Sequence, residues 1–139
     1  GQYLDLTFEK KKISQKKIIE MQKKKTGELF GFCCESVAII ANKNAKVRKK
    51  LKDIGIDIGL LFQITDDMLD FKGNSDLVGK PTKMDSKKGK ATLINLIGYE
   101  KTLIFANKIK RQLEKKIKRL GSKSEDLLES VDFLLDRDF

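Results

Sequence analysis

One stretch of the chain, F62-Q-I-T-D-D-M-L-D-F71, places three aspartates among mostly apolar residues. The aspartates are Asp66, Asp67 and Asp70, and all three lie within five consecutive positions. Burying a carboxylate is costly unless a positive charge compensates it. The stretch therefore predicts that a cation, supplied by the protein or by a ligand, lies opposite these three side chains.

The three aspartates fall on one face of a helix predicted over residues 45–71. Apolar residues from Val47 to Met68 recur at steps of three or four, which is typical of the buried face of an amphipathic helix. At about 100° per residue, the three carboxylates share one arc with Gln63 and lie away from the apolar stripe. The helix therefore presents an acidic face near its C-terminal end.

The same side of this helix carries no side chain for two turns before the acids, because Gly55 and Gly59 occupy it. We expect this side to be hollow and to help leave room for a ligand. The alternative is that another helix packs closely against the two glycines. Helical periodicity alone does not choose between these two arrangements.

The clustered carboxylates also predict a metal site. They repel one another, and the helix dipole disfavours negative charge in the last turns of a helix. A bound cation would offset both costs, and because the site offers only oxygen ligands and the chain has no histidine, the expected ion is Mg²⁺ or Ca²⁺. A lysine-rich loop predicted over residues 72–91 follows directly and could supply cations for a phosphate group. The alternative is a solvated acidic face without a ligand.

Helical periodicity extends over most of the chain, and the alternating pattern of β-strands is nearly absent. We therefore expect residues 1–139 to form one all-α domain. Capping and breaker residues set the boundaries of its helices. Besides the helix over residues 45–71, we predict the end of a helix at residues 1–6 and a helix that runs from its N-cap Ser14 to about Ala41. A further helix is predicted over residues 92–120 and ends at Gly121. The last helix is predicted over residues 123–137, and a capping box from Ser122 to Glu125 opens it.

The charge of the chain favours anionic partners. The 139 residues carry a formal net charge of +10 at pH 7, which suits nucleic acid, a membrane surface or phosphorylated small molecules. The sequence contains no Trp and only two Tyr, and the interleaving of aromatic with basic residues that is expected of single-strand binding platforms is missing. No apolar run is long enough to span a membrane. The two cysteines, Cys33 and Cys34, are adjacent and fit a reducing compartment, so we expect a cytoplasmic protein.

Four motifs, in order, resemble those of the trans-isoprenyl diphosphate synthases, the family of the farnesyl and geranylgeranyl diphosphate synthases. Together they span nearly the whole chain, and four motifs in this order are far more specific than one DDxxD. They are G1-Q-Y-L-D-L6 for the G-Q-x-x-D-L of the family, K25-T-G27 for its K-T-G, Phe62 to Asp70 for its second aspartate-rich motif F-Q-x-x-D-D-x-L-D, and G79-K80, Asp85 and G89-K90 for the loop that follows.

The resemblance implies an antiparallel helical bundle of the isoprenoid synthase type that catalyses head-to-tail prenyl transfer. Enzymes of this family join an allylic diphosphate to isopentenyl diphosphate, and Mg²⁺ ions hold the allylic diphosphate between two aspartate-rich motifs. Carried over position by position, the resemblance implies three groups of site residues. Asp66 would bind Mg²⁺ directly, and Asp67 and Asp70 would hold its water molecules. Lys25, Lys80 and Lys90 would contact the allylic diphosphate, and Thr26 and Gln63 would lie at the reacting centre.

In the family, the first aspartate-rich motif and the basic residues that bind isopentenyl diphosphate lie upstream of G-Q-x-x-D-L. We therefore expect this chain to be the C-terminal part of one synthase domain and to be inactive alone. It should expose the apolar face that upstream helices would cover. The complete protein is expected to be a homodimer. The motifs present do not encode product chain length.

Two other functions stay open. The first is a non-catalytic regulatory subunit, but the intact aspartates and lysines of the motifs argue against it. The second is a basic helical nucleic-acid-binding protein, which only the net charge supports.

Overall fold

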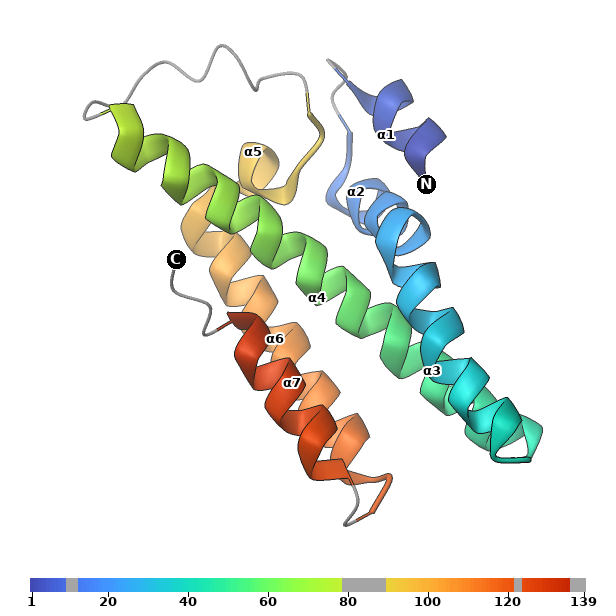
Figure 1. Cartoon of the computed structure of the whole chain (residues 1–139). Helices are drawn as coiled ribbons and strands as arrows, with labels where there is room; N and C mark the ends of the chain where they lie inside the picture. Colours follow the sequence, from blue (N-terminus) through green and yellow to red (C-terminus); the bar gives the residue numbers. More distant parts are fainter. Residues whose placement is uncertain (10–12, 79–89, 122–123, 136–139) are drawn as a thin grey trace.

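The computed structural model describes residues 1–9, 13–78, 90–121 and 124–135, and all regular structure in these ranges is helical. The prediction of an all-α protein is therefore confirmed. In chain order the elements are α1 (Gln2–Phe8), α2 (Gln15–Gln22), the π-helical turn η1 (Lys23–Gly27), α3 (Glu28–Ile40), α4 (Ala45–Val78), α5 (Leu93–Ile97), α6 (Tyr99–Lys118) and α7 (Glu125–Leu135) (Figure 1).

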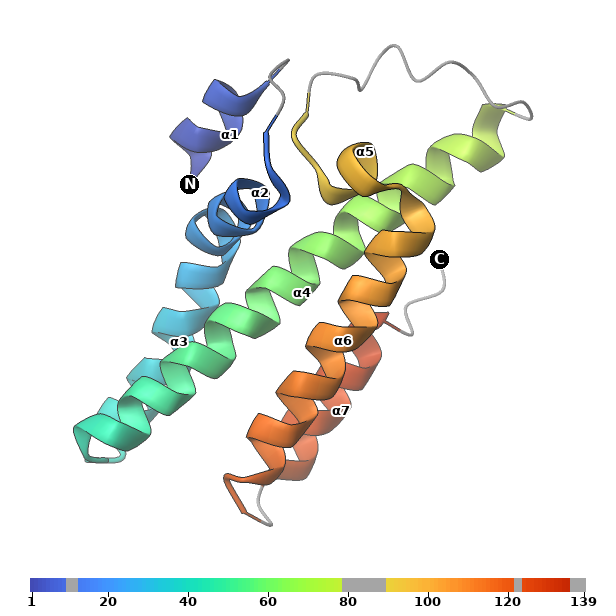
Figure 2. The same ribbon diagram turned by 180° about the vertical axis from the view of Figure 1, so that it is seen from behind.

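The long helix α4 forms the centre of the fold. Figure 1 and the view from behind in Figure 2 show it crossing the molecule, with α2, η1 and α3 along one side and α6 and α7 along the other. The buried side chains of Leu61 and Ile64 on α4 belong to one hydrophobic core with Ile18 of α2 and with Leu113 and Ile117 of α6. Helices α2 and α6 therefore bury apolar side chains against α4, as the helical periodicity predicts.

The helix predicted from Ser14 to about Ala41 is divided into three parts. Ser14 is its N-cap, as predicted, and the side-chain oxygen of Ser14 accepts a hydrogen bond from the backbone N–H of Lys17 at 3.5 Å. The chain then passes from α2 to α3 through η1, a π-helical turn formed by K23-K-K-T-G27. Such turns are rare and frequently lie at functional sites. This one contains Lys25 and Thr26, two of the predicted site residues.

Helix α4 continues past its predicted end. The sequence predicts a loop from residue 72, whereas the helix extends to Val78. The ring of Phe71 stacks on that of Tyr99 at the start of α6, with 5.8 Å between the ring centroids, and this contact anchors the turn that follows Asp70. The prediction of a loop over residues 72–78 is therefore wrong. Residues 79–89 of the predicted loop lie outside the described residues.

The helix predicted over residues 92–120 is interrupted at Gly98. The side chain of Thr92 caps α5 by accepting a hydrogen bond from the backbone N–H of Asn95 at 3.2 Å. Gly98 has a φ of +84° and turns the chain from α5 into α6. Glycine adopts this left-handed region without a steric penalty. The single predicted helix is therefore two helices, because one glycine in a helical pattern redirects the chain.

Helix α6 ends at Lys118, two residues before its predicted end, and the left-handed Gly121 lies in the turn that follows, with a φ of +109°. The hydroxyl of Ser124 donates a hydrogen bond to the carbonyl oxygen of Gly121 at 2.7 Å and so ties the turn to the start of α7. Ser122 of the predicted capping box lies outside the described residues. Helix α7 itself begins at Glu125, within the predicted range.

The glycine side of α4 is closely packed against η1 and α3, not hollow. A Cβ atom on Gly59 would lie 2.8 Å from the Cα of Gly27, and a Cβ atom on Gly55 would meet the carbonyl oxygen of Phe30 and the Cα of Gly31. The expectation that this side leaves room for a ligand is therefore wrong. Because the glycines have no side chains, the backbones of the two helices approach each other instead. We call this contact of Gly27, Gly31, Gly55 and Gly59 the glycine seam.

Substitution of Gly59 by alanine is expected to destabilise the protein by about 1–3 kcal/mol, the usual cost of overpacking a filled interior. Gly73→Ala is the matched control on the same helix, because a Cβ there would meet no atom within 4 Å. It should stabilise α4 by about 0.5–1 kcal/mol through helix propensity. Urea unfolding of both variants measures the difference, and equal unfolding free energies for the two would contradict the close packing of the glycine seam.

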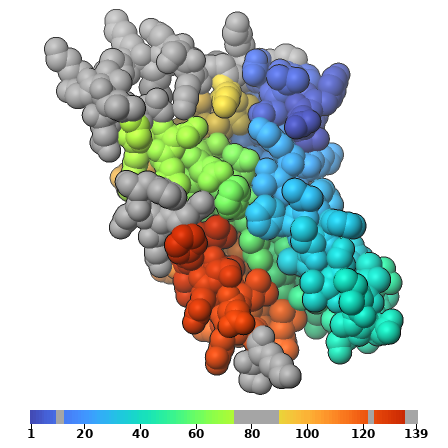
Figure 3. Space-filling model, in the orientation of Figure 1, coloured from blue at the N-terminus to red at the C-terminus, as the bar shows by residue number. Residues whose placement is uncertain are grey.

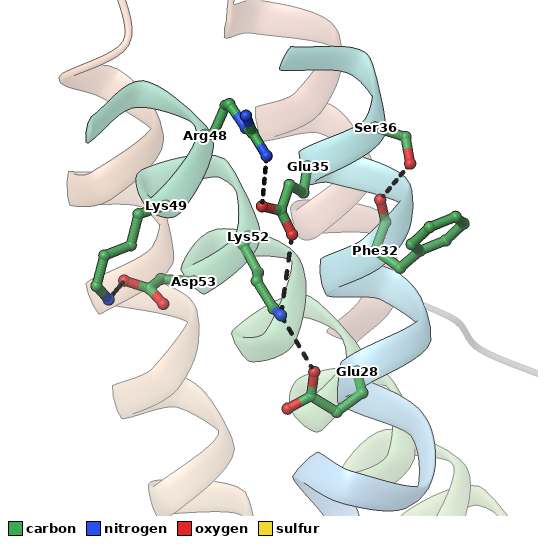
Figure 4. A network of polar contacts seen from close by, with 8 residues as sticks. All are labelled: Glu28, Phe32, Glu35, Ser36, Arg48, Lys49, Lys52 and Asp53. Atoms are coloured by element: carbon green, nitrogen blue, oxygen red, sulfur yellow. Dashed lines mark hydrogen bonds and ion pairs between the residues drawn. The ribbon is translucent and has the colours of Figure 1, made fainter. Parts of the chain in front are cut away.

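Charged side chains flank the glycine seam and join α3 to α4 (Figure 4). Glu35 of α3 lies between Arg48 and Lys52 of α4, at 3.7 and 3.8 Å, and Lys52 also faces Glu28 at 3.7 Å. Partly exposed ion pairs of this kind contribute about 0–1 kcal/mol each. The ion pairs therefore add only modestly to the close backbone packing that joins α3 to α4 in the glycine seam.

Large apolar side chains of α3 face outward. The sequence places Leu29, Phe32 and Val37 among the apolar positions of their helix, yet these side chains are 64–65% exposed, and Ile40 is 82% exposed. The buried residues of α3 are the small Gly31 and Ala38, and Phe30 packs against Phe62 of α4 with 5.6 Å between the ring centroids. An apolar face is thus exposed among the described residues, and its covering by upstream helices stays a prediction. None of the described helices combines the length and apolar composition needed to cross a bilayer.

Candidate active site

A pocket of about 420 Å³ lies where α1, the α2–η1 segment, the C-terminal half of α4 and the residues just before α5 come together. Figure 3 shows these parts gathered toward one end of the molecule, with α1 and α2 in blue beside the yellow segment and the green part of α4. The polar side chains that line the pocket come from all four parts: Asp5, Gln22, Lys25, Gln63, Asp66, Asp67, Asp70, Lys90 and Thr92.

The structure brings most of the predicted site residues to this pocket. All three aspartates of α4 line it, together with Gln63 from the preceding turn and with Lys25 and Lys90 from other segments. Thr26 reaches the site through Gln63, as described below. Lys80 lies outside the described residues.

A chain of hydrogen bonds links η1 to the second aspartate. The hydroxyl of Thr26 donates to the Oε1 atom of Gln63 at 2.9 Å, and the Nε2 atom of Gln63 donates to the Oδ1 atom of Asp67 at 3.2 Å. The π-helical turn brings Thr26 toward α4, and the spacing of four residues places Gln63 over Asp67. The Gln63 amide is therefore held at both ends in one orientation.

Gln22 holds the other oxygen of the same carboxylate. The Nε2 atom of Gln22 donates to the Oδ2 atom of Asp67 at 2.9 Å, and the Gln22 side chain is only 2% exposed. The motif-based interpretation missed this residue, although a signal was present. Gln22 follows Ile18 by four positions and therefore lies on the apolar face of α2, where a polar residue is unusual.

Burial raises the pKa of the Asp67 carboxyl from its ordinary value of 3.8 to about 6. The hydrogen bond from Gln63 and the positive charges of Lys25 and Lys90 act in the opposite direction, whereas the negative charge of Asp70 adds to the increase. Asp67 is thus a largely desolvated carboxylate that is ionised at neutral pH. Such a group gains from a cation brought close to it.

Lys25 is directed into the pocket by Asp5 of α1. The Nζ atom of Lys25 lies 2.5 Å from the Oδ2 atom of Asp5. Gly1 packs against the backbone of Lys24 and Lys25, and a Cβ atom at Gly1 would collide with it. The first motif thus supports the lysine of the second, and Asp5 is a lining residue that the sequence interpretation quoted in its motif without assigning it to the site.

The acids do not form a complete metal cage by themselves. Within the described ranges, no three acidic, cysteine or histidine side chains converge closely enough to hold an ion. Asp66, Asp67 and Asp70 nevertheless line one wall of the pocket, and their carboxylate oxygens suit Mg²⁺. Mg²⁺ is commonly bound by one or two carboxylates together with substrate phosphates and water. The donor set therefore fits a Mg²⁺ ion that arrives with a diphosphate.

Curated relatives match nearly the whole chain. A short chain isoprenyl diphosphate synthase of Methanocaldococcus jannaschii is 37% identical over 137 residues, which cover 96% of this chain and 40% of that protein. A farnesyl diphosphate synthase of Micrococcus luteus is 31% identical over 137 residues, which cover 99% of this chain and 47% of that protein. The chain thus spans less than half the length of either relative.

Solved structures have the same fold. The apo structure of an FPP/GFPP synthase from Zymomonas mobilis matches with a TM-score of 0.77 and 33% identity, over 96% of this chain and 43% of that one. A geranyltransferase from Helicobacter pylori, complexed with magnesium and isoprenyl diphosphate, matches with a TM-score of 0.76 and 26% identity, over 97% of this chain and 44% of that one. The predicted helical bundle of the isoprenoid synthase type is confirmed.

The family profile described as "Polyprenyl synthetase" matches residues 1–133. This range contains all four motifs and every residue that lines the pocket. The chain therefore belongs to the polyprenyl synthetase family.

Proposed function

We propose that the full-length protein condenses isopentenyl diphosphate with an allylic diphosphate, head to tail, to make a short-chain isoprenyl diphosphate. The observation that carries this proposal is one pocket in which Asp66, Asp67 and Asp70 on α4 face Lys25 and Lys90 from separate segments. Opposed carboxylates and ammonium groups suit a ligand that consists of a diphosphate and divalent cations. Neither a nucleic-acid site nor a purely regulatory role needs such an arrangement.

In this reaction the allylic diphosphate ionises, so the C–O bond breaks and negative charge develops on the departing diphosphate. Lys25 and Lys90 place fixed positive charge where that charge develops, and preorganised charge of this kind is usually a large catalytic contribution. Mg²⁺, when bound, neutralises further negative charge on the leaving group. Asp66, Asp67 and Asp70 are the residues that would hold it.

We propose that the Thr26 and Gln63 side chains act on the allylic carbocation rather than on the diphosphate. Because the Thr26 hydroxyl and Asp67 fix the Gln63 amide from both ends, its dipole needs little reorganisation when charge appears. The carbonyl oxygen of that amide carries partial negative charge, which can steady an allylic carbocation. We propose this role for Gln63, with Thr26 as the residue that orients it.

Replacing Lys25 with glutamine is expected to raise the KM for the allylic diphosphate about 10- to 100-fold, since a hydrogen bond to a charged group contributes about 1.5–3 kcal/mol. Lys24→Gln is the matched control, because the neighbouring Lys24 pairs with Glu20 on the surface at 2.8 Å. Steady-state kinetics of the full-length variants measure the difference. An unchanged KM in Lys25→Gln would contradict the proposed diphosphate site.

A further inference from the structure

Gln22 is a buried amide with an unused acceptor. Its side chain is 2% exposed and lines the pocket, and its neighbours Ile18 and Met21 on α2 are buried apolar residues. The Oε1 atom of Gln22 is buried and accepts no hydrogen bond from any described residue. Buried polar atoms are nearly always hydrogen-bonded, so an exception calls for a physical explanation.

The orientation of this amide is fixed by its other end. The Nε2 atom of Gln22 donates to Oδ2 of Asp67 at 2.9 Å, while Gln63 donates to Oδ1 of the same carboxylate at 3.2 Å. Rotating the Gln22 amide by 180° would set Oε1 against a carboxylate oxygen and lose the hydrogen bond. The acceptor atom is therefore held in place beside the aspartate-lined wall.

We infer that Gln22 is a positioning residue for the proposed Mg²⁺–diphosphate site: it holds Asp67 through Nε2 and offers Oε1 to a water molecule of the hydrated cation. This inference rests on the proposed function. Water bound to a cation donates its hydrogens outward, so the surroundings of a hydrated Mg²⁺ need acceptors. Residues that orient metal-binding groups in this way commonly change metal affinity 10- to 100-fold when they are replaced.

A packing role alone makes the opposite prediction. Methionine has nearly the shape of glutamine and would fill the same space without an unpaired polar atom. If Gln22 served only to pack α2 against α4, Gln22→Met would keep the affinity for Mg²⁺ and would fold at least as well as the wild type. The two roles therefore separate in a binding measurement that does not depend on turnover.

The experiment is a calorimetric titration of Mg²⁺ into the full-length protein in saturating inorganic pyrophosphate, for the wild type, Gln22→Met and Gln22→Leu. Gln112→Met, which makes the same change at an exposed position of α6, is the control. We expect both Gln22 variants to need about 10- to 100-fold more Mg²⁺ for half-saturation, with the control unchanged. Thermal unfolding in EDTA should be unaffected or shifted upward, and kcat at saturating Mg²⁺ should change far less than the Mg²⁺ requirement.

The pair Gln22 and Asp67 provides the second measurement. Because Gln22 acts on the site partly through Asp67, the effect of Gln22→Met should shrink in an Asp67→Asn background. Half-saturation within twofold of the wild type for both folded Gln22 variants would overturn the inference while leaving the proposed function intact. A wild type that binds no Mg²⁺ with pyrophosphate would overturn both.

Discussion

Replacing Asp66 with alanine should lower kcat/KM for the condensation by about 100-fold or more in the full-length protein. Asp66 lines the pocket, and the family resemblance implies that it is a direct Mg²⁺ ligand. Removing one preorganised group that supports charge development typically costs about 100- to 1000-fold in rate. The loss should persist at high substrate concentration, because it concerns the leaving diphosphate and not only binding.

The matched control for this variant is Asp53→Ala on the same helix. Asp53 pairs with Lys49 on the surface at 2.9 Å (Figure 4), outside the pocket lining. Its removal should leave turnover unchanged and cost at most about 1 kcal/mol of stability. If Asp66→Ala kept turnover within about twofold of the wild type, the metal assignment would be wrong.

The second large effect is a dependence of stability on pH that comes from Asp67. The pKa of its carboxyl is about 6 in the fold, against an ordinary value of 3.8. Between these values the folded state binds more protons than the unfolded chain, so the contribution of Asp67 to stability falls as pH rises. Across the window from about pH 4 to pH 6 the loss is on the order of 3 kcal/mol for the metal-free protein.

Asp67→Asn isolates this contribution from that of the other carboxyl groups. The variant cannot carry the buried charge, so its stability relative to the wild type should improve steadily as pH rises from 4 to 7 in EDTA. Urea unfolding at several pH values measures the difference. Mg²⁺ with pyrophosphate should stabilise the wild type more than the variant, because the amide that replaces the carboxylate carries no negative charge to attract the cation. A difference that does not change with pH would contradict the burial of this carboxylate.

The acidic face of α4 could be predicted because helical geometry alone determines it. Once residues 45–71 are helical, Gln63 must lie one turn before Asp67, and the aspartates must share a side of the helix. The structure bears out that placement, with a hydrogen bond of 3.2 Å between Gln63 and Asp67. The lysine motif could likewise be placed at the site, but only through its resemblance to a family.

Features that depend on contacts between distant segments could not be predicted in this way. Gln22 and Asp67 are 45 positions apart, and no local pattern joins them. Gly55 and Gly59 are equally compatible with a cavity and with a packed seam, because the outcome depends on whether another backbone approaches. The π-helical turn at η1 has no distinctive composition, and the stacking of Phe71 on Tyr99 joins residues 28 positions apart.

The exposed apolar stripe of α3 illustrates the same limit. Leu29, Phe32 and Val37 recur at helical spacing and therefore have the pattern of core residues, yet the described residues leave them uncovered. Whether such a stripe is buried depends on what packs against it, which periodicity does not specify. The chain spans less than half the length of the curated relatives discussed above.

The most direct measurement of the central claim is incorporation of labelled isopentenyl diphosphate by the full-length protein in the presence of an allylic diphosphate. We predict that label appears in a longer isoprenyl diphosphate with Mg²⁺, and that EDTA abolishes the reaction. The Asp66→Ala protein should give almost no product under the same conditions. A folded wild-type protein that forms no condensation product with Mg²⁺, or forms as much in EDTA, would contradict the account.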